Sequence, residues 1–191
     1  MMVVTLVIVG AGMAFLISPW VLTVIAATTL SIQGATTIQN DRTSRWHDVA
    51  ALLPMPRSTV ITSKYLLYLA LCMAGIALGF AVSAGMTALG RAFDAKEAYL
   101  YTCTAVTVSL LPGSIGLPCA FKLEGEKILV GMMLAYAGAS VLFVGAVLAV
   151  RYLLDLKAVM PQFMGCAALF SAACYGISWW IGARRLPLRQ P

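Results

Sequence analysis

The chain has 191 residues, of which 61% are hydrophobic and only 10% are charged, and its mean hydropathy is +0.92. Soluble domains carry about 25% charged residues, so this composition excludes a soluble globule and indicates a protein of the lipid bilayer. The net charge of +6 comes from basic residues scattered between apolar runs, which is not the clustered pattern of a nucleic-acid-binding protein.

Six apolar runs without Asp, Glu, Lys or Arg follow one another along the chain. Each is close to the length of about 20 residues that a helix needs to cross a bilayer, and none alternates as a transmembrane strand would. We therefore predict an all-α membrane protein, a single domain over residues 1–191 with six transmembrane helices. The predicted spans are residues 1–18, 20–39, 65–89, 98–121, 128–150 and 161–182.

The second predicted span carries a row of uncharged polar residues, Thr29, Gln33, Thr36 and Asn40. Their spacing of i, i+4, i+7 and i+11 places them on one face of a helix. Two interpretations are open. The first is hydrogen bonding to neighbouring helices, which is the commoner role of such residues. The second is the wall of a polar translocation path, formed by Thr29, Gln33 and Thr36.

The longest connection between spans follows this helix and contains a short amphipathic pattern. Its apolar residues at i, i+3, i+4 and i+7 are Trp46, Val49, Ala50 and Leu53. This spacing predicts a helix over about residues 43–53, which Pro54 ends. Such a helix either lies on the membrane surface or binds a partner protein. The sole histidine, His47, lies here, but its neighbour Asp48 points to a different helix face.

The third and fourth spans contain helix-packing and helix-breaking signals. Gly75 and Gly79 form a GxxxG motif, which allows close backbone approach either within the chain or between subunits. Pro112 and Pro118 lie in the fourth span, and two prolines so close together predict a kink or a break.

The orientation follows from the distribution of Lys and Arg among the loops. Nine basic residues fall on one predicted side: Arg42, Arg45, Arg57, Lys64, Lys122, Lys127, Arg184, Arg185 and Arg189. Four fall on the other: Arg91, Lys96, Arg151 and Lys157. Because cytoplasmic loops are enriched in basic residues, we expect both termini to lie in the cytoplasm.

Two cytoplasmic stretches resemble a known family. Trp46 is followed by Leu53-Pro54-Met55-Pro56-Arg57 and then by Ser63-Lys64-Tyr65-Leu66, which is similar to the pattern "W…LPvsR..iv.sKyl" of small ABC-2 type permeases. Residues 117–127 are similar to that family's "lPl.fKfG.eKg". These permeases are the membrane subunits of bacterial ABC exporters, including the phenol-soluble modulin exporter.

The resemblance implies that residues 43–53 form a coupling helix, seated in a groove of a separate ATPase subunit. The positions it assigns to ATPase coupling are Trp46, Val49, Ala50, Leu53, Pro54, Arg57, Lys122, Glu126 and Lys127. The implied partners are two copies of an ABC ATPase, which bind ATP and Mg, and a second permease chain that is either a copy of this one or a paralogue.

The sequence has no GxxxxGK[ST] motif, no HExxH motif and no Ser-His-Asp arrangement. We therefore expect no enzymatic activity, cofactor or metal in this chain. The expected function is export of amphipathic peptides, toxin-like or antimicrobial, across a bacterial cytoplasmic membrane. The alternatives are an ABC-2 efflux permease for drugs or lipophiles, and a non-transport membrane protein that acts in assembly or immunity.

Overall fold

The computed structural model describes residues 18–43, 57–88, 94–123, 126–153 and 156–185, and every regular element in these ranges is an α-helix. The helices are α2 (Val21–Thr43), α4 (Arg57–Ala88), α5 (Ala95–Lys122), α6 (Glu126–Leu153) and α7 (Leu156–Arg185). The all-α prediction is confirmed for the described part of the chain. The first predicted span, apart from Ser18, and nearly all of the predicted coupling helix lie outside the described residues.

Four described helices are long and apolar enough to cross a membrane. These segments are Thr59–Ala88, Ala95–Phe121, Val130–Val150 and Val159–Arg184, and Val21–Thr37 is a shorter apolar helix. The four long segments correspond to the predicted third to sixth spans, and the shorter apolar helix lies within the predicted second span. Several helices extend beyond the predicted span, because backbone hydrogen bonding continues where the apolar run has ended. The clearest case is α4, which begins at Arg57 rather than Tyr65.

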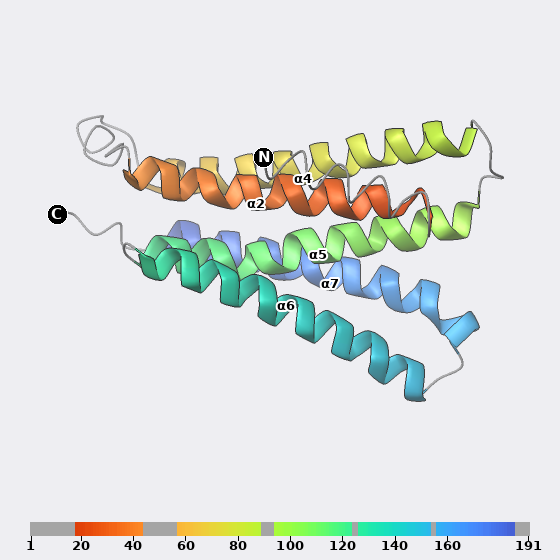
Figure 1. The fold of residues 1–191 in the computed structure, drawn as a ribbon. Coiled ribbons are helices and arrows are strands. Elements are labelled where there is room, and N and C mark those ends of the chain that lie inside the picture. Colours follow the sequence, from red (N-terminus) through yellow and green to blue (C-terminus); the bar gives the residue numbers. More distant parts are fainter. Residues whose placement is uncertain (1–17, 44–56, 89–93, 124–125, 154–155, 186–191) are drawn as a thin grey trace.

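The helices run side by side in alternating directions, as Figure 1 shows. Helix α5 is central, since it packs against each of the other four described helices. Helix α2 packs along α4 and α5, and α7 packs mainly against α5. Helix α6 packs chiefly against α5 and diverges from it toward Leu153 (Figure 1). The outer half of α6 is accordingly exposed, with Val141 at 71%.

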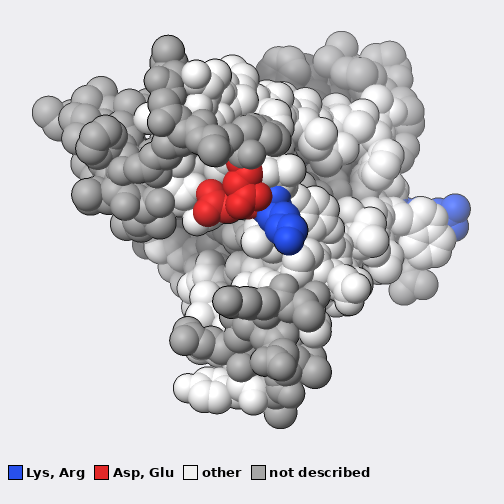
Figure 2. Space-filling model, turned by 90° about the vertical axis from the view of Figure 1, so that its right-hand side faces the viewer, with Lys and Arg blue, Asp and Glu red and all other residues white. Residues whose placement is uncertain are grey.

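One end of the bundle is formed where α2 and α5 begin. The backbone N–H of Val21 donates to the Ser18 carbonyl oxygen at 3.2 Å, and the Asp94 carboxylate caps α5 by accepting from the N–H of Lys96 at 2.8 Å. Ser18 Oγ donates to Glu97 Oε2 at 3.2 Å, which joins the two helix starts. Figure 2 faces this end and shows acidic atoms beside basic ones.

The GxxxG motif of α4 packs against α2 of the same chain. A Cβ atom on Gly75 would lie 2.8 Å from the Ala26 carbonyl oxygen, and one on Gly79 would lie 2.5 Å from the Cα atom of Thr23. The backbones of the two helices therefore meet directly at these glycines. Of the two predicted uses of this motif, packing within the chain is the one observed.

Helix α5 runs through both of its prolines as one helix from Ala95 to Lys122. Of the kink or break predicted at Pro112 and Pro118, the break does not occur. Backbone carbonyls that lose a donor at a proline are tolerated in a membrane helix when neighbouring side chains supply another one. For the Ser114 carbonyl, which Pro118 leaves without its helical donor, the hydroxyl that does so is that of Ser178, described next.

Candidate functional site

The predicted polar row lies on α2. Thr29 Oγ1 donates to the Ile25 carbonyl oxygen at 2.6 Å, and Thr36 Oγ1 donates to the Gln33 carbonyl oxygen at 2.9 Å. Gln33 and Asn40 are exposed, and both threonines are partly exposed. The two threonine hydroxyls are therefore satisfied by their own helix rather than by its neighbours. Within one chain, the α2 row forms an open, uncharged polar surface.

A second group of polar side chains, which the sequence analysis missed, lies between four helices, and all but the partly buried Tyr136 are buried. Tyr68 Oη of α4 donates to the Ser109 carbonyl oxygen of α5 at 2.6 Å and lies 3.3 Å from Tyr136 Oη of α6. Tyr136 Oη in turn lies 3.5 Å from Ser31 Oγ of α2. We call Ser31, Tyr68, Ser109 and Tyr136 the central polar cluster. It ties α2, α4, α5 and α6 together in the apolar interior.

A parallel group connects α4, α5 and α7. Ser178 Oγ of α7 donates to the Ser114 carbonyl oxygen of α5 at 2.7 Å, and it lies 3.1 Å from Tyr65 Oη of α4. Tyr175 Oη donates to the Tyr65 carbonyl oxygen at 2.6 Å. The Tyr175 ring stacks on Tyr68 with ring centroids 5.8 Å apart, so the two groups form one continuous core.

One sequence signal points to these tyrosines. Tyr65, Tyr68 and Cys72 are spaced at i, i+3 and i+7, which is one helix face, and all three are buried. A buried tyrosine needs a partner for its hydroxyl. In a fourth span with two prolines, carbonyl oxygens without a backbone donor are available as such partners.

The opposite end of the bundle holds the predicted coupling positions that the structure describes. Leu123 ends α5, and its backbone N–H donates to the Cys119 carbonyl oxygen at 2.9 Å. Leu123, Lys127, Val130, Gly131 and Leu134 line an open groove of about 400 Å³ at the turn between α5 and α6. Lys127 is exposed there. The groove is apolar apart from this one ammonium group.

Three of the remaining coupling positions lie within the described residues. Arg57 is the first residue of α4, Lys122 the last of α5 and Glu126 the first of α6, so these three flank the same end of the bundle (Figure 1). The five predicted coupling residues from 46 to 54 lie outside the described residues: Trp46, Val49, Ala50, Leu53 and Pro54. The role of all nine in ATPase coupling stays a prediction.

Trp179 and Trp180 lie near the same end, in the last turns of α7. The Arg184 guanidinium lies 4.5 Å from the centroid of the Trp180 ring, a cation–π contact, and Trp179 Nε1 donates to Thr62 Oγ1 at 3.4 Å. Paired tryptophans next to a basic residue are typical of a membrane–water interface.

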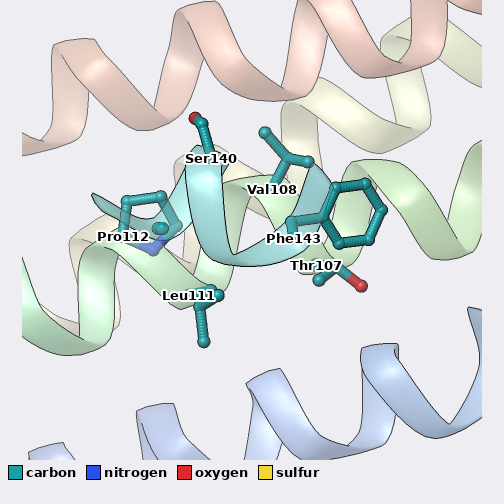
Figure 3. A pocket seen from close by; sticks show the side chains of 7 residues that line it. Thr107, Val108, Leu111, Pro112, Ser140 and Phe143 are labelled. Atoms are coloured by element: carbon teal, nitrogen blue, oxygen red, sulfur yellow. The ribbon is translucent and has the colours of Figure 1, made fainter. Parts of the chain in front are cut away.

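A small recess lies between α5 and α6, as Figure 3 shows. Its walls are Thr107, Val108, Leu111, Pro112, Ala139, Ser140 and Phe143. Its volume is about 10 Å³, which is about the space of a single water molecule. This recess is far too small for a transported molecule, so no cargo site lies within the described part of one chain at this position.

The family described as ABC-2 family transporter protein matches residues 1–185. Comparisons with curated proteins and with solved structures found no match.

Proposed function

Because the chain belongs to the ABC-2 transporter family, we propose that it is the permease subunit of a bacterial ABC exporter for amphipathic peptides. The family match carries this proposal, since it extends over residues 1–185 and so includes all five described helices. The family implies a multi-pass membrane protein with an ABC ATPase partner. The sequence contains no P-loop motif, so we assign ATP hydrolysis to that partner.

The proposed contact with the ATPase lies at the end of the bundle that carries Arg57, Lys122 and Lys127. The proposed coupling helix, residues 43–53, lies between α2 and α4 in the sequence. Helices α2 and α4 pack along each other. A movement of this segment, driven by the ATPase, would therefore be transmitted first to α2 and α4. Trp46 is the proposed anchor, because a tryptophan buried in a partner's groove typically contributes about 2 kcal/mol or more to binding.

We propose that two chains form the transporter and that the translocation path lies between them. The recess between α5 and α6 of one chain is too small for a cargo, and the polar α2 row is exposed or partly exposed. A surface for a second chain is available on α4, on the side away from α2. Its exposed small residues are Ala70, Ala74, Ala77, Ala81 and Gly85. Such residues allow two helices to approach closely.

The proposed cargo follows from the character of the α2 row. Thr29, Gln33 and Thr36 are uncharged, and Ile32 beside them is exposed. A surface of this kind has no charged side chain with which to bind an ion or a small anion. Its mixture of uncharged polar and apolar side chains suits an amphipathic helix, which has one polar and one apolar face. We therefore favour amphipathic peptides, with lipophilic drugs as the competing cargo.

The test is ATPase activity of the complex reconstituted in liposomes with the ATP-binding protein encoded beside this chain. We expect stimulation by short amphipathic helical peptides, and loss of it in Gln33→Leu/Thr36→Val. The matched control is Thr102→Val on α5, where the hydroxyl also bonds to its own helix. Stimulation by small drugs alone would replace peptides by drugs as cargo.

Association with the ATPase is tested separately by co-purification. We expect Trp46→Ala to reduce the co-purified ATPase at least tenfold without changing the yield of the permease. A chain that retains no ATPase in its natural form would instead favour a non-transport role in assembly or immunity.

A further inference from the structure

The two prolines of α5 each remove a backbone donor from the middle of a membrane helix. In an α-helix the N–H of residue i+4 donates to the carbonyl of residue i, and proline has no N–H. Pro112 therefore leaves the Val108 carbonyl without its helical donor, and Pro118 leaves the Ser114 carbonyl without one. No water is available in the hydrocarbon core to replace them, so each such group is costly unless a side chain serves it.

Side chains from two other helices donate to this part of α5. Ser178 Oγ of α7 donates to the Ser114 carbonyl at 2.7 Å, which is the group that Pro118 leaves unserved. Tyr68 Oη of α4 donates to the Ser109 carbonyl at 2.6 Å, in the turn that Pro112 opens. The Tyr68 hydroxyl thus donates to the carbonyl next to the one that Pro112 deprives of its helical donor, whereas the Ser178 hydroxyl donates to the same carbonyl that Pro118 deprives of its donor.

The hydrogen bond from Tyr68 depends on space that two glycines leave for its ring. A Cβ atom on Gly113 would lie 2.6 Å from Cζ and 2.7 Å from Oη of Tyr68, so only glycine leaves room for the ring here. Gly34 on α2 lines the other side of the slot, since its Cβ would lie 3.1 Å from the Tyr68 ring. Gly113, the residue after Pro112, thus leaves room for the Tyr68 hydroxyl to donate to the Ser109 carbonyl.

The two donors sit on helices that lead to the proposed ATPase-facing end. Helix α4 begins at Arg57, a few residues after the proposed coupling segment, and α7 ends at Arg185 at the same end of the bundle (Figure 1). A shift of α4 or α7 against α5 by about 1 Å takes a 2.6–2.7 Å hydrogen bond beyond its normal range. Packed helices respond to such shifts by moving between discrete arrangements.

We propose that residues 108–118 of α5 are a hinge, and that the Tyr68 and Ser178 hydroxyls are a two-point latch that holds it closed in this state. Withdrawal of α4 and α7 during the ATPase cycle releases both carbonyls, and α5 then bends at Pro112 and Pro118. The place of the hinge in transport rests on the proposed function. The latch itself is a property of the single chain.

The first experiment measures amide hydrogen exchange in the segment 108–122 of the chain in lipid nanodiscs. We expect Tyr68→Phe and Ser178→Ala to raise exchange in this segment about tenfold. The matched control is Tyr136→Phe, which removes a hydroxyl that contacts Tyr68 but no carbonyl of α5. Unchanged exchange in both latch variants, in protein that is folded, would overturn the proposal.

A rescue variant separates the latch from a general loss of packing. Pro118→Ala restores the N–H that donates to the Ser114 carbonyl, so Ser178→Ala should raise exchange when Pro118 is present and have no further effect beside Pro118→Ala. An equal increase in both backgrounds contradicts the latch, because it shows that Ser178 acts only by packing.

The second experiment uses the complex with its ATPase, trapped with ATP and vanadate. Trapping should raise amide exchange in segment 108–122 of the unaltered chain. In a latch variant, where this segment is already released, trapping should not change the exchange further. If trapping does not alter this segment, the hinge has no place in the cycle. If no ATPase assembles with the chain, the proposed function fails, and the nanodisc measurement still decides the latch.

Discussion

Tyr68 shows how a single polar aromatic residue is accommodated in the apolar interior. Its side chain is 0% exposed, and its ring occupies the slot between Gly34 and Gly113. A buried tyrosine requires both space for the ring and a partner for the hydroxyl. The two glycines provide the space, and the Ser109 carbonyl provides the acceptor. Neither glycine is replaceable by a larger residue without moving the ring.

Gly113→Ala should therefore destabilise the bundle. The added methyl group would overlap the Tyr68 ring, and overpacking of a core typically costs about 1–3 kcal/mol. Thermal unfolding of the purified chain in detergent should show a lower Tm. The matched control is Gly138→Ala on α6, where a Cβ atom would meet nothing within 4 Å and the Tm should change little. Equal Tm values for the two variants would contradict the tight fit of the Tyr68 ring against Gly113.

At the scale of the helices, composition predicted which segments are helical but not how they pair. Apolar runs identified five of the described helices because the bilayer imposes a length and a polarity on each span. The motif of Gly75 and Gly79 indicated a close helix contact, yet the choice of α2 as partner depends on the three-dimensional arrangement. Likewise, the hydroxyls that donate to carbonyls of α5 near its prolines belong to Tyr68 and Ser178, which are distant from them in sequence.

The candidate site was predictable to a similar extent. The spacing of Thr29, Gln33 and Thr36 correctly placed them on one face of α2, because helical periodicity is a local property. Whether that face is buried is not local, and the observed bonds of both threonines to their own helix were not predicted. The central polar cluster was missed because its members come from four helices.

The exposed small residues of α4 lead to a prediction for the proposed dimer. In a cysteine-free background, Ala77→Cys should form a disulfide between two chains on oxidation, since small residues let paired helices come within the Cα separation of about 4.4–6.8 Å that a disulfide requires. Addition of Gly85→Leu on the same face should suppress it. The control is Ala137→Cys, which is exposed on α6. Cross-linking of the control alone would move the interface to α6.

At the scale of the whole molecule, the two ends of the bundle differ in charge. Within the described ranges, the charged residues at the end seen in Figure 2 are Asp94, Lys96, Glu97, Arg151 and Lys157. Those toward the other end are Asp41, Arg42, Arg57, Lys64, Lys122, Glu126, Lys127, Arg184 and Arg185. The helices alternate in direction, so every connection predicted to be cytoplasmic is flanked by helix ends at this second end (Figure 1). The excess of basic residues there predicts that it faces the cytoplasm.

Cysteine labelling from outside the cell tests this orientation. In a cysteine-free background, a membrane-impermeant maleimide should label Lys96→Cys in intact cells, because Lys96 is exposed at the first turn of α5. It should spare Lys127→Cys, which is exposed at the start of α6, until the membrane is permeabilised. Both variants keep an exposed position, so a difference in labelling reports sidedness rather than burial. The reverse pattern would put Lys127 and the segments beside it outside the cell. No cytoplasmic ATPase could then reach them, and the proposed coupling would fail together with the topology.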